Sequence, residues 1–288
     1  MGDCGTARMS GTSFFIIFSD LDGTLLDHKT YAWKEAQPAL NLCKGLRIPV
    51  VLVSSKTRAE MDSLRRKLSI SSPFISENGG GIFFPDEFVE KPPLETSFDK
   101  GLWKWALGLP YMHLTKCLHE IREELEWNIK GFSDMSIEEI SQLTGLDRET
   151  SRLAAMREFD EPFIIPEKKC LDKKALLKAA GKRGLTITCG GRFYHLQGKN
   201  DKGKAMEKII SWYSHGHGQI FSIALGDSPN DFSMLERANF PVLIRSQQQF
   251  PDLKEKIPRL KITREMGPKG WNTAVLDILG KKEEKSNA

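Results

Sequence analysis

The fold is decided by the stretch FFIIFSDLDGT, residues 14–24. Its continuous apolar run predicts a strand that is buried on both faces, as in a parallel sheet. Asp20 and Asp22 follow at the strand end, and side chains two residues apart in an extended segment point to the same face. Gly23 then lets the chain turn without hindrance from a Cβ atom. Two carboxylates at one point repel each other, so the pattern predicts a site for a divalent cation and an anionic substrate.

Two further apolar runs repeat this arrangement. Residues 49–53 predict a strand that ends at Ser54, and residues 221–225 predict one that ends at Gly226 and Asp227. Helical patterns fall between them at residues 31–45, 58–68 and 201–213, and a short third strand is predicted at residues 74–76. The alternation predicts an α/β fold with a Rossmann-like parallel sheet and helices on both faces. Ligands bind at the carboxyl ends of such strands, where these polar residues are expected to converge.

Residues 84–197 break the alternation and predict an inserted domain. Helical patterns near residues 113–126 and 136–144 mix there with apolar runs at 163–165, 185–188 and 193–196. We expect an inserted α+β cap over residues 84–197, with a catalytic core formed by residues 13–83 and 198–280. Trp103, Trp105 and Trp127 are expected to fill the core of the cap. Residues 1–12 and the charged residues 281–288 are predicted to be flexible termini.

Composition narrows the class of protein. The 288 residues are 40% hydrophobic and 28% charged, which is typical of a soluble globular protein. A formal net charge of +4 is too small to indicate a nucleic-acid partner. No apolar run approaches the roughly 18 residues that a membrane span needs. The five cysteines are odd in number and expected to be reduced thiols. We therefore expect a cytoplasmic monomer or homodimer with neither a nucleic-acid nor a membrane partner.

The first residues, MGDCGT, fit the template for N-myristoylation. The template is short and loose, so a flexible leader is the alternative interpretation. Mass spectrometry of the intact native protein distinguishes the two.

A second acidic motif, GDSPND at residues 226–231, follows another apolar run, and Lys202-Gly203 opens the helix before that run. Strand-end acids, hydroxyls and one lysine are suited to binding Mg²⁺ and a phosphoryl group, because Mg²⁺ prefers oxygen ligands and keeps positions for water and substrate. Alone, DxDG could be a calcium loop and GDxxxD a helix cap. Their order along the chain, with a lysine between them, favours the catalytic interpretation.

Together these motifs resemble those of the haloacid dehalogenase superfamily of phosphatases, which carry DxDGT, a strand-end Ser or Thr, a Lys and GDxxxD in this order. The form GDSPNDFSML at residues 226–235, the Lys-Gly pair and the insertion after the third strand resemble its class IIB, the Cof-like sugar phosphatases. Within that class, SSKTRAE (54–60), ENGGG (77–81) and REFDEPF (157–163) are similar to segments of mannosyl-3-phosphoglycerate phosphatases. The likeness covers roughly residues 13–280.

The resemblance implies Mg²⁺-dependent hydrolysis of mannosyl-3-phosphoglycerate to mannosylglycerate and phosphate through an aspartyl-phosphate. Three alternatives stay open. They are a class IIB phosphatase of another sugar phosphate, such as glucosyl-3-phosphoglycerate, a sugar phosphotransferase or mutase, and a non-catalytic phosphosugar-binding regulator.

The resemblance also implies a role for each residue that matches a motif. Asp20 would be the nucleophile, and Asp22 would be the general acid and then the general base. Ser54 would bind a phosphoryl oxygen, and Lys202 would neutralise charge on Asp20 and the phosphate. The Mg²⁺ ligands would be Asp20, Asp22 through its main-chain carbonyl, Asp227, and Asp231 as a further or indirect ligand.

Candidates for contact with a phosphorylated sugar acid lie outside these four motifs. They are Ser55, Asn78, Gly79, Gly80, Arg157, Arg192 and His195. A carboxylate on the substrate would favour an arginine fork, whereas an ordinary ion pair is the alternative for the cationic members. The glycine run at residues 79–81 cradles phosphate through main-chain N–H groups, forms a hinge to the cap, or does both.

Overall fold

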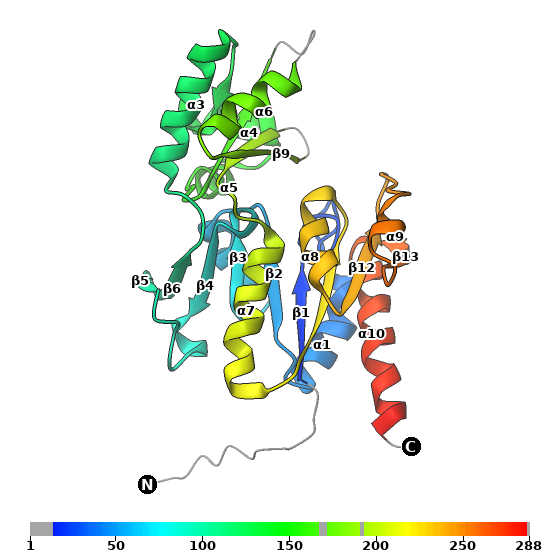
Figure 1. The fold of residues 1–288 in the computed structure, drawn as a ribbon. Helices are drawn as coiled ribbons and strands as arrows, with labels where there is room; N and C mark the ends of the chain where they lie inside the picture. The colour runs from blue at the N-terminus through cyan, green and yellow to red at the C-terminus, as the bar shows by residue number, and fades with distance from the viewer. Residues whose placement is uncertain (1–13, 167–171, 191–192, 287–288) are drawn as a thin grey trace.

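The structure, a computed structural model, describes residues 14–166, 172–190 and 193–286 (Figure 1). Its strands are β1 (Phe14–Ser19), β2 (Val50–Val53), β3 (Phe74–Ser76), β4 (Gly81–Pro85), β5 (Ser97–Asp99), β6 (Leu102–Ala106), β7 (Lys130–Gly131), β8 (Asp160–Ile164), β9 (Thr186–Gly190), β10 (Phe193–Gln197), β11 (Ile220–Gly226), β12 (Phe240–Arg245) and β13 (Lys261–Met266). Its α-helices are α1 (Gln37–Gly45), α2 (Arg58–Lys67), α3 (Tyr111–Leu125), α4 (Ile137–Thr144), α5 (Arg148–Ala154), α6 (Lys173–Lys182), α7 (Lys202–His217), α8 (Phe232–Arg237), α9 (Leu253–Lys256) and α10 (Gly267–Ser286).

The larger sheet has nine strands in the order β13-β12-β11-β1-β2-β3-β4-β6-β5. The six strands from β13 to β3 are parallel, which confirms the predicted parallel core. The last three strands add an antiparallel extension that the sequence did not predict. The larger sheet therefore continues to residue 106, beyond the predicted cap boundary at residue 84. The glycines at residues 79–81 turn the chain back so that β4 pairs with β3 rather than leaving the sheet.

The predicted place of two tryptophans is wrong for the same reason. Trp103 and Trp105 lie on β6 and pack against the apolar cluster on one face of the larger sheet. Trp127 does pack against the core of the smaller unit, as expected. Residues 102–106 form a strand of the larger sheet, so the side chains of Trp103 and Trp105 lie on a face of that sheet.

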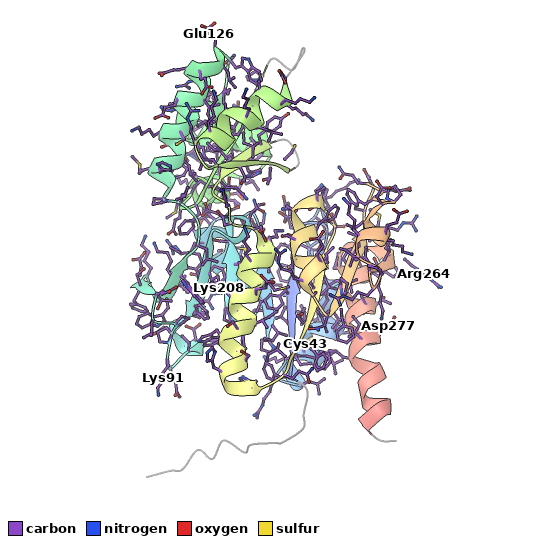
Figure 2. The ribbon with its side chains drawn as sticks, viewed as in Figure 1. Cys43, Lys91, Glu126, Lys208, Arg264 and Asp277 are labelled. Atoms are coloured by element: carbon purple, nitrogen blue, oxygen red, sulfur yellow. The ribbon has the colours of Figure 1, made fainter. Side chains whose placement is uncertain are left out.

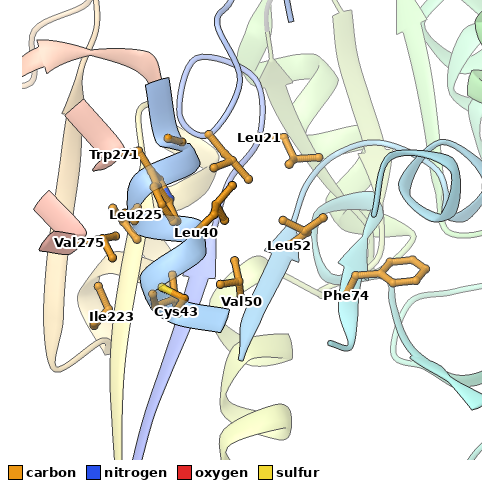
Figure 3. Close-up of a cluster of buried hydrophobic side chains, with 14 of the residues drawn as sticks. Leu21, Leu40, Cys43, Val50, Leu52, Phe74, Ile223, Leu225, Trp271 and Val275 are labelled. Atoms are coloured by element: carbon orange, nitrogen blue, oxygen red, sulfur yellow. The ribbon is translucent and has the colours of Figure 1, made fainter. Parts of the chain in front are cut away.

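Helices cover both faces of the larger sheet. The helices α1 and α10 pack on one face, and α7 and α8 pack on the other. Figure 3 shows Leu40 and Cys43 of α1 and Trp271 of α10 gathered beside Leu225 of β11. Trp271 is fully buried, and its Nε1 donates a hydrogen bond to Ser19 Oγ at 2.9 Å, which ties α10 to the end of β1.

Local signals set the helix ends that position the site. A capping box begins α2, because Thr57 accepts from the main-chain N–H of Glu60 while the Glu60 carboxylate accepts from that of Thr57. Asp201 caps α7, whose first residue is Lys202. The helix α10 runs to Ser286, into the charged residues 281–288 that are predicted to be a flexible terminus; lysine and glutamate are good helix formers.

The smaller sheet has the order β7-β8-β10-β9, is antiparallel, and packs against α3 and α6. Its apolar core includes Leu118, Ile121, Phe163 and Leu196. Figure 1 shows this unit at the carboxyl end of β1. Strand β9 contacts the short helix η5 (Pro229–Asp231), so the smaller unit lies over the polar ends of the larger sheet. No helix in the described part of the chain has the length and apolar character needed to cross a membrane.

Candidate active site

Three acids from two segments meet at the carboxyl ends of neighbouring strands. Asp20 follows β1 and Asp227 follows β11, and these two strands pair along their whole length. Asp231 is the last residue of η5. One carboxylate oxygen from each of the three lies within 4.8 Å of the others. The structure therefore brings together acids that are about two hundred residues apart in the sequence, as the strand-end pattern predicts.

Lys202 lies among these acids. Its side chain is only 1% exposed, and its Nζ is 2.7 Å from Asp20 Oδ1 and 2.6 Å from Asp231 Oδ1. Burial alone would lower the pKa of this lysine, but the two carboxylates raise it above its usual value. Lys202 is thus a permanent cation inside the site. The first turn of α7 points it there, because the Asp201 cap fixes where the helix begins.

The acids outnumber the lysine, so the cluster carries two net negative charges when every group is ionised. Burial raises the pKa of Asp20, and although Lys202 opposes this effect, Asp231 and Asp227 add to it. Burial and the charge of Asp231 likewise raise the pKa of Asp227 to about 6. A divalent cation would relieve this repulsion, and the donors are the carboxylate oxygens that Mg²⁺ prefers. The residues present therefore fit a magnesium ion.

Asp231 has contacts that bear on its predicted role. Its Oδ1 accepts from Lys202, and its Oδ2 accepts from the main-chain N–H groups of Asp227 and Ser228 at 3.0 and 3.1 Å. The side chain is fully buried. These contacts hold the Gly226–Asp231 turn and orient Lys202, which favours the indirect role over direct coordination of a metal ion.

Asp22 lies at the edge of the cluster. Its side chain is 33% exposed, and its Oδ2 is 2.8 Å from Lys56 Nζ. The turn after Asp22 needs a glycine at position 23. Gly23 has φ +82°, and a Cβ atom there would lie 2.6 Å from Asp227 Oδ2. Lys56 was not among the predicted site residues. Its position two residues after Ser54, at another strand end, is the signal that could have found it.

Ser54 lies at the end of β2 and is 2% exposed. Its Oγ accepts from the main-chain N–H of Lys56 at 3.2 Å, which does not consume its own hydroxyl hydrogen. The hydroxyl can therefore donate to an oxygen of a ligand. Ser55 is half-buried, and its main-chain carbonyl accepts two hydrogen bonds from Arg157.

Arg157 and His195 share Asp160 in a buried ion network, which Arg157 extends to Ser55 of the larger unit. Each is 9% exposed. The Nη2 atom of Arg157 donates to Asp160 Oδ2 at 2.6 Å, and His195 Nδ1 lies 2.8 Å from the same oxygen. Asp160 and the Ser55 carbonyl together occupy the guanidinium fork of Arg157. The geometry favours the ion-pair alternative over the predicted contact with substrate, while Arg192 lies outside the described residues.

The segment at residues 77–80 joins the same network. Glu77 accepts from the main-chain N–H groups of Glu158 and Phe159, the shorter at 2.7 Å. Burial raises the pKa of Glu77 to about 7, although Arg157 opposes the shift. The main-chain N–H of Gly80 donates to Ser76, and its carbonyl accepts from Leu107 and Gly108.

Gly79 and Gly80 are closely packed, with no room for a side chain. A Cβ atom on Gly79 would collide with the main chain of Asp201, and one on Gly80 would collide with Phe159. Together with the Gly80 hydrogen bonds, this favours the hinge interpretation of the glycine run over a phosphate cradle.

Asn78 connects the two halves of the site. Its Oδ1 accepts from Asn230 at 3.1 Å, its main-chain carbonyl accepts from Asn200 at 3.4 Å, and its N–H donates to the Ser54 carbonyl at 3.0 Å. It is 4% exposed. Asn78 therefore fixes the turn that carries the second acidic motif relative to the end of β2, and its predicted contact with substrate stays a prediction.

A cavity of about 810 Å³ lies on the outer side of the junction between the units. It is lined by Leu109, Gly198, Lys204 and Lys208, among others, and Figure 2 shows Lys208 on α7. None of the clustered acids lines it. The candidate site is thus defined by the convergence of charged groups at the strand ends and not by this cavity.

Comparison with known proteins agrees with the geometry. Residues 17–108 match the family of haloacid dehalogenase-like hydrolases. A glucosyl-3-phosphoglycerate/mannosyl-3-phosphoglycerate phosphatase of Methanococcoides burtonii is 40% identical over 269 residues, which is 92% of this chain and 97% of the relative. A phosphatase of the same name from Persephonella marina is 38% identical over 93% of this chain and 98% of its own.

The fold is also shared with solved structures. The structure of a sugar phosphatase of HAD subclass IIB matches with a TM-score of 0.62 and 17% identity, covering 93% of this chain and 99% of that one. This likeness supports the architecture of a parallel sheet with a second, antiparallel unit. With both sequence relatives matching nearly from end to end, the chain belongs to the glucosyl-3-phosphoglycerate/mannosyl-3-phosphoglycerate phosphatase family of haloacid dehalogenase-like hydrolases.

Proposed function

We propose that this protein is a Mg²⁺-dependent phosphatase that hydrolyses mannosyl-3-phosphoglycerate and glucosyl-3-phosphoglycerate to the glycosylglycerate and phosphate. The observation that carries the proposal is the buried Lys202 between Asp20 and Asp231, next to Asp227. The names of the two relatives suggest both sugars. A phosphorylated sugar acid also suits a site that pairs fixed cations with a metal-binding cluster.

In the first step, a carboxylate oxygen of Asp20 attacks phosphorus, and the bond from phosphorus to the ester oxygen of the glycerate breaks. Asp22 gives its proton to that leaving oxygen. In the second step, water attacks the phosphorus of the aspartyl-phosphate, Asp22 takes a proton from the water, and phosphate leaves Asp20. Lys202 stabilises negative charge on the phosphoryl oxygens in both steps, and the hydroxyl of Ser54 donates to one of them.

The metal ion would be held by the carboxylates of Asp20 and Asp227 and the main-chain carbonyl of Asp22. When bound, Mg²⁺ supplies positive charge between the nucleophile and the phosphate, whose mutual repulsion otherwise opposes attack. Asp231 supports this arrangement indirectly by orienting Lys202 and the Gly226–Asp231 turn.

We propose that the smaller unit, approximately residues 107–197, acts as a mobile cap. It lies over the strand ends through the contact of β9 with η5, so closure would exclude bulk water from the reacting groups. The ion network lies in the segments at residues 77–80 and 157–160. We expect the cap to pivot about these two segments.

A phosphate-release assay tests the proposal. Mannosyl-, glucosyl- and unglycosylated 3-phosphoglycerate are incubated with the protein and Mg²⁺, and the glycosylated esters are expected to release phosphate at the highest kcat/KM. Asp22→Asn serves as the control and is expected to lose phosphate release. A binding protein without catalysis would not need this acid. Transfer of the phosphoryl group to a sugar hydroxyl, with no free phosphate, would show a phosphotransferase instead.

A further inference from the structure

Lys56 has no role in the mechanism above, yet it lies directly beside the acid that acts on the leaving oxygen. Its side chain is 16% exposed, and its Nζ is 2.8 Å from Asp22 Oδ2 and 5.4 Å from the centre of the Tyr31 ring. We propose that Lys56 binds the carboxylate of the glycerate portion of the substrate and is thereby the residue that selects phosphoglycerate esters. This inference rests on the proposed function and names the determinant of its specificity.

The chemistry of the substrate places its carboxylate near this lysine. In a 3-phosphoglycerate ester, only two carbon atoms separate the phosphate ester oxygen from the carboxyl carbon. Asp22 must contact that ester oxygen to protonate it. Since Lys56 already lies within hydrogen-bond distance of Asp22, a carboxylate two carbons beyond the ester oxygen falls within its reach.

Lys56 can bind the substrate without releasing Asp22. An ammonium group has three N–H donors, and the contact with Asp22 uses one of them. The ordinary side chain of lysine is charged at neutral pH, and here it is paired with the carboxylate of Asp22. A charged donor with capacity left for a second acceptor is what an incoming carboxylate requires.

Other cations near the site are occupied by protein groups. Lys202 contacts Asp20 and Asp231, and the fork of Arg157 contacts Asp160 and a main-chain carbonyl. Arg58 and Lys104 both bind Glu158, on the junction between the units. Among the cations described around the strand ends, Lys56 is the one that is both partly exposed and in contact with the proposed acid.

The test compares two substrates that differ only at the carboxylate. One is mannosyl-3-phosphoglycerate, and the other is its analogue in which the carboxylate is a hydroxymethyl group. The measured quantity is the ratio of their kcat/KM values. Lys56→Met is expected to lower this ratio about 10- to 100-fold, the range for one charged hydrogen bond. Lys56→Arg, which keeps the positive charge, is expected to restore most of it.

Lys130→Met is the matched control, because it removes another lysine of an ion pair, with Glu139 in the smaller unit, away from the acids. It should leave the ratio unchanged. If Lys56→Met slows both substrates equally, the lysine only positions Asp22 and the inference is wrong. If that variant does not fold, as judged by circular dichroism, Lys56→Gln gives the same readout. Failure of the wild-type protein to release phosphate from either compound would instead overturn the proposed function, and the inference with it.

Discussion

Replacement of Asp20 by asparagine should abolish turnover and, in the absence of metal, make the protein more stable. Asp20 is the proposed nucleophile, so Asp20→Asn is expected to lower kcat by about 10⁴-fold or more. The effect on stability follows from the crowded charges. Asp20 is 7% exposed and shares the cluster with Asp227, Asp231 and a single lysine.

The magnitude can be worked from the distances. At an effective dielectric constant of about 20, two like charges no more than 4.8 Å apart repel by about 3.5 kcal/mol or more, so the variant loses at least about 7 kcal/mol of repulsion from Asp227 and Asp231. It also loses the attraction of Lys202 at 2.7 Å, about 6 kcal/mol on the same scale. The desolvation cost of a buried carboxylate disappears as well. The net expectation is a free energy of unfolding about 1 kcal/mol or more above that of the wild type.

The assay is urea unfolding followed by circular dichroism at about pH 8, once with a chelator and once with saturating Mg²⁺. With the chelator, Asp20→Asn should be the more stable protein. With Mg²⁺ the difference should shrink or reverse, because a ligand at about 100 times its Kd stabilises the wild type by about 2.7 kcal/mol and the variant has lost a metal ligand. Asp22→Asn, the same change two residues away, should lose turnover without a gain in stability. A metal-free Asp20→Asn protein less stable than the wild type would refute the electrostatic reasoning. A variant that keeps about 1% of the wild-type kcat would refute the assignment of Asp20 as the nucleophile.

Three other changes probe the buried charges. Lys202→Met leaves buried carboxylates without their cation, so metal-free unfolding should cost about 3–5 kcal/mol less; a loss below about 1 kcal/mol in the same urea assay contradicts the geometry. Arg157→Met should lower the melting temperature in calorimetry, because the guanidinium fork ties Ser55 to Asp160. An unchanged melting temperature with a raised KM would instead support the predicted contact of Arg157 with substrate. Glu77 has its pKa raised from 4.5 to about 7, so the folded state binds this proton more tightly than the unfolded state. The contribution of Glu77 protonation to the free energy of unfolding is complete below pH 4.5. It is lost as the pH rises through about 7, by about 3 kcal/mol in all. Glu77→Gln should flatten this decline in unfolding free energy, measured in Mg²⁺ buffers; an unchanged slope would show that another group titrates.

The sequence predicts the parallel core and its acidic cluster well because both depend on local signals. A run of apolar residues that ends in Asp20 identifies a buried strand and its polar end without knowledge of any partner. Asp227 repeats the signal, and topology alone then brings the two ends to one edge of the sheet. Lys202 is predicted from the Lys-Gly pair that opens a helix, and in the structure the Asp201 cap places this first residue of α7 at that edge.

The extension of the sheet and the partners of Arg157 could not be predicted in the same way. The strand β6, LWKWA, is only partly buried, and it pairs with β4 across a connection that contains β5. An arginine in a sequence likewise does not show whether its fork meets a substrate or a buried carboxylate. Only the position of Asp160 on the neighbouring strand decides that here.

The three segments that resemble those of mannosyl-3-phosphoglycerate phosphatases meet at one place in the structure. SSKTRAE, ENGGG and REFDEPF are far apart in the sequence, yet Arg157 donates to Ser55, Glu77 accepts from the main chain at Phe159, and Arg58 pairs with Glu158. These contacts are made between the two units. In the proposed mechanism, most of the residues in these segments would fix how the cap sits on the core and would not line the substrate.

Specificity would then have two sources. In the proposed mechanism, the way the cap sits on the core would set the space available for the sugar, because β9 contacts η5 and Arg157 joins the two units through Ser55. Lys56, within the first of the three segments, is the member that still faces the proposed leaving group. Changes in the ion network should alter the preference between mannosyl and glucosyl esters, whereas changes at Lys56 should alter the preference for the carboxylate. Separate effects of this kind on the two preferences would not arise if all three segments acted only through stability.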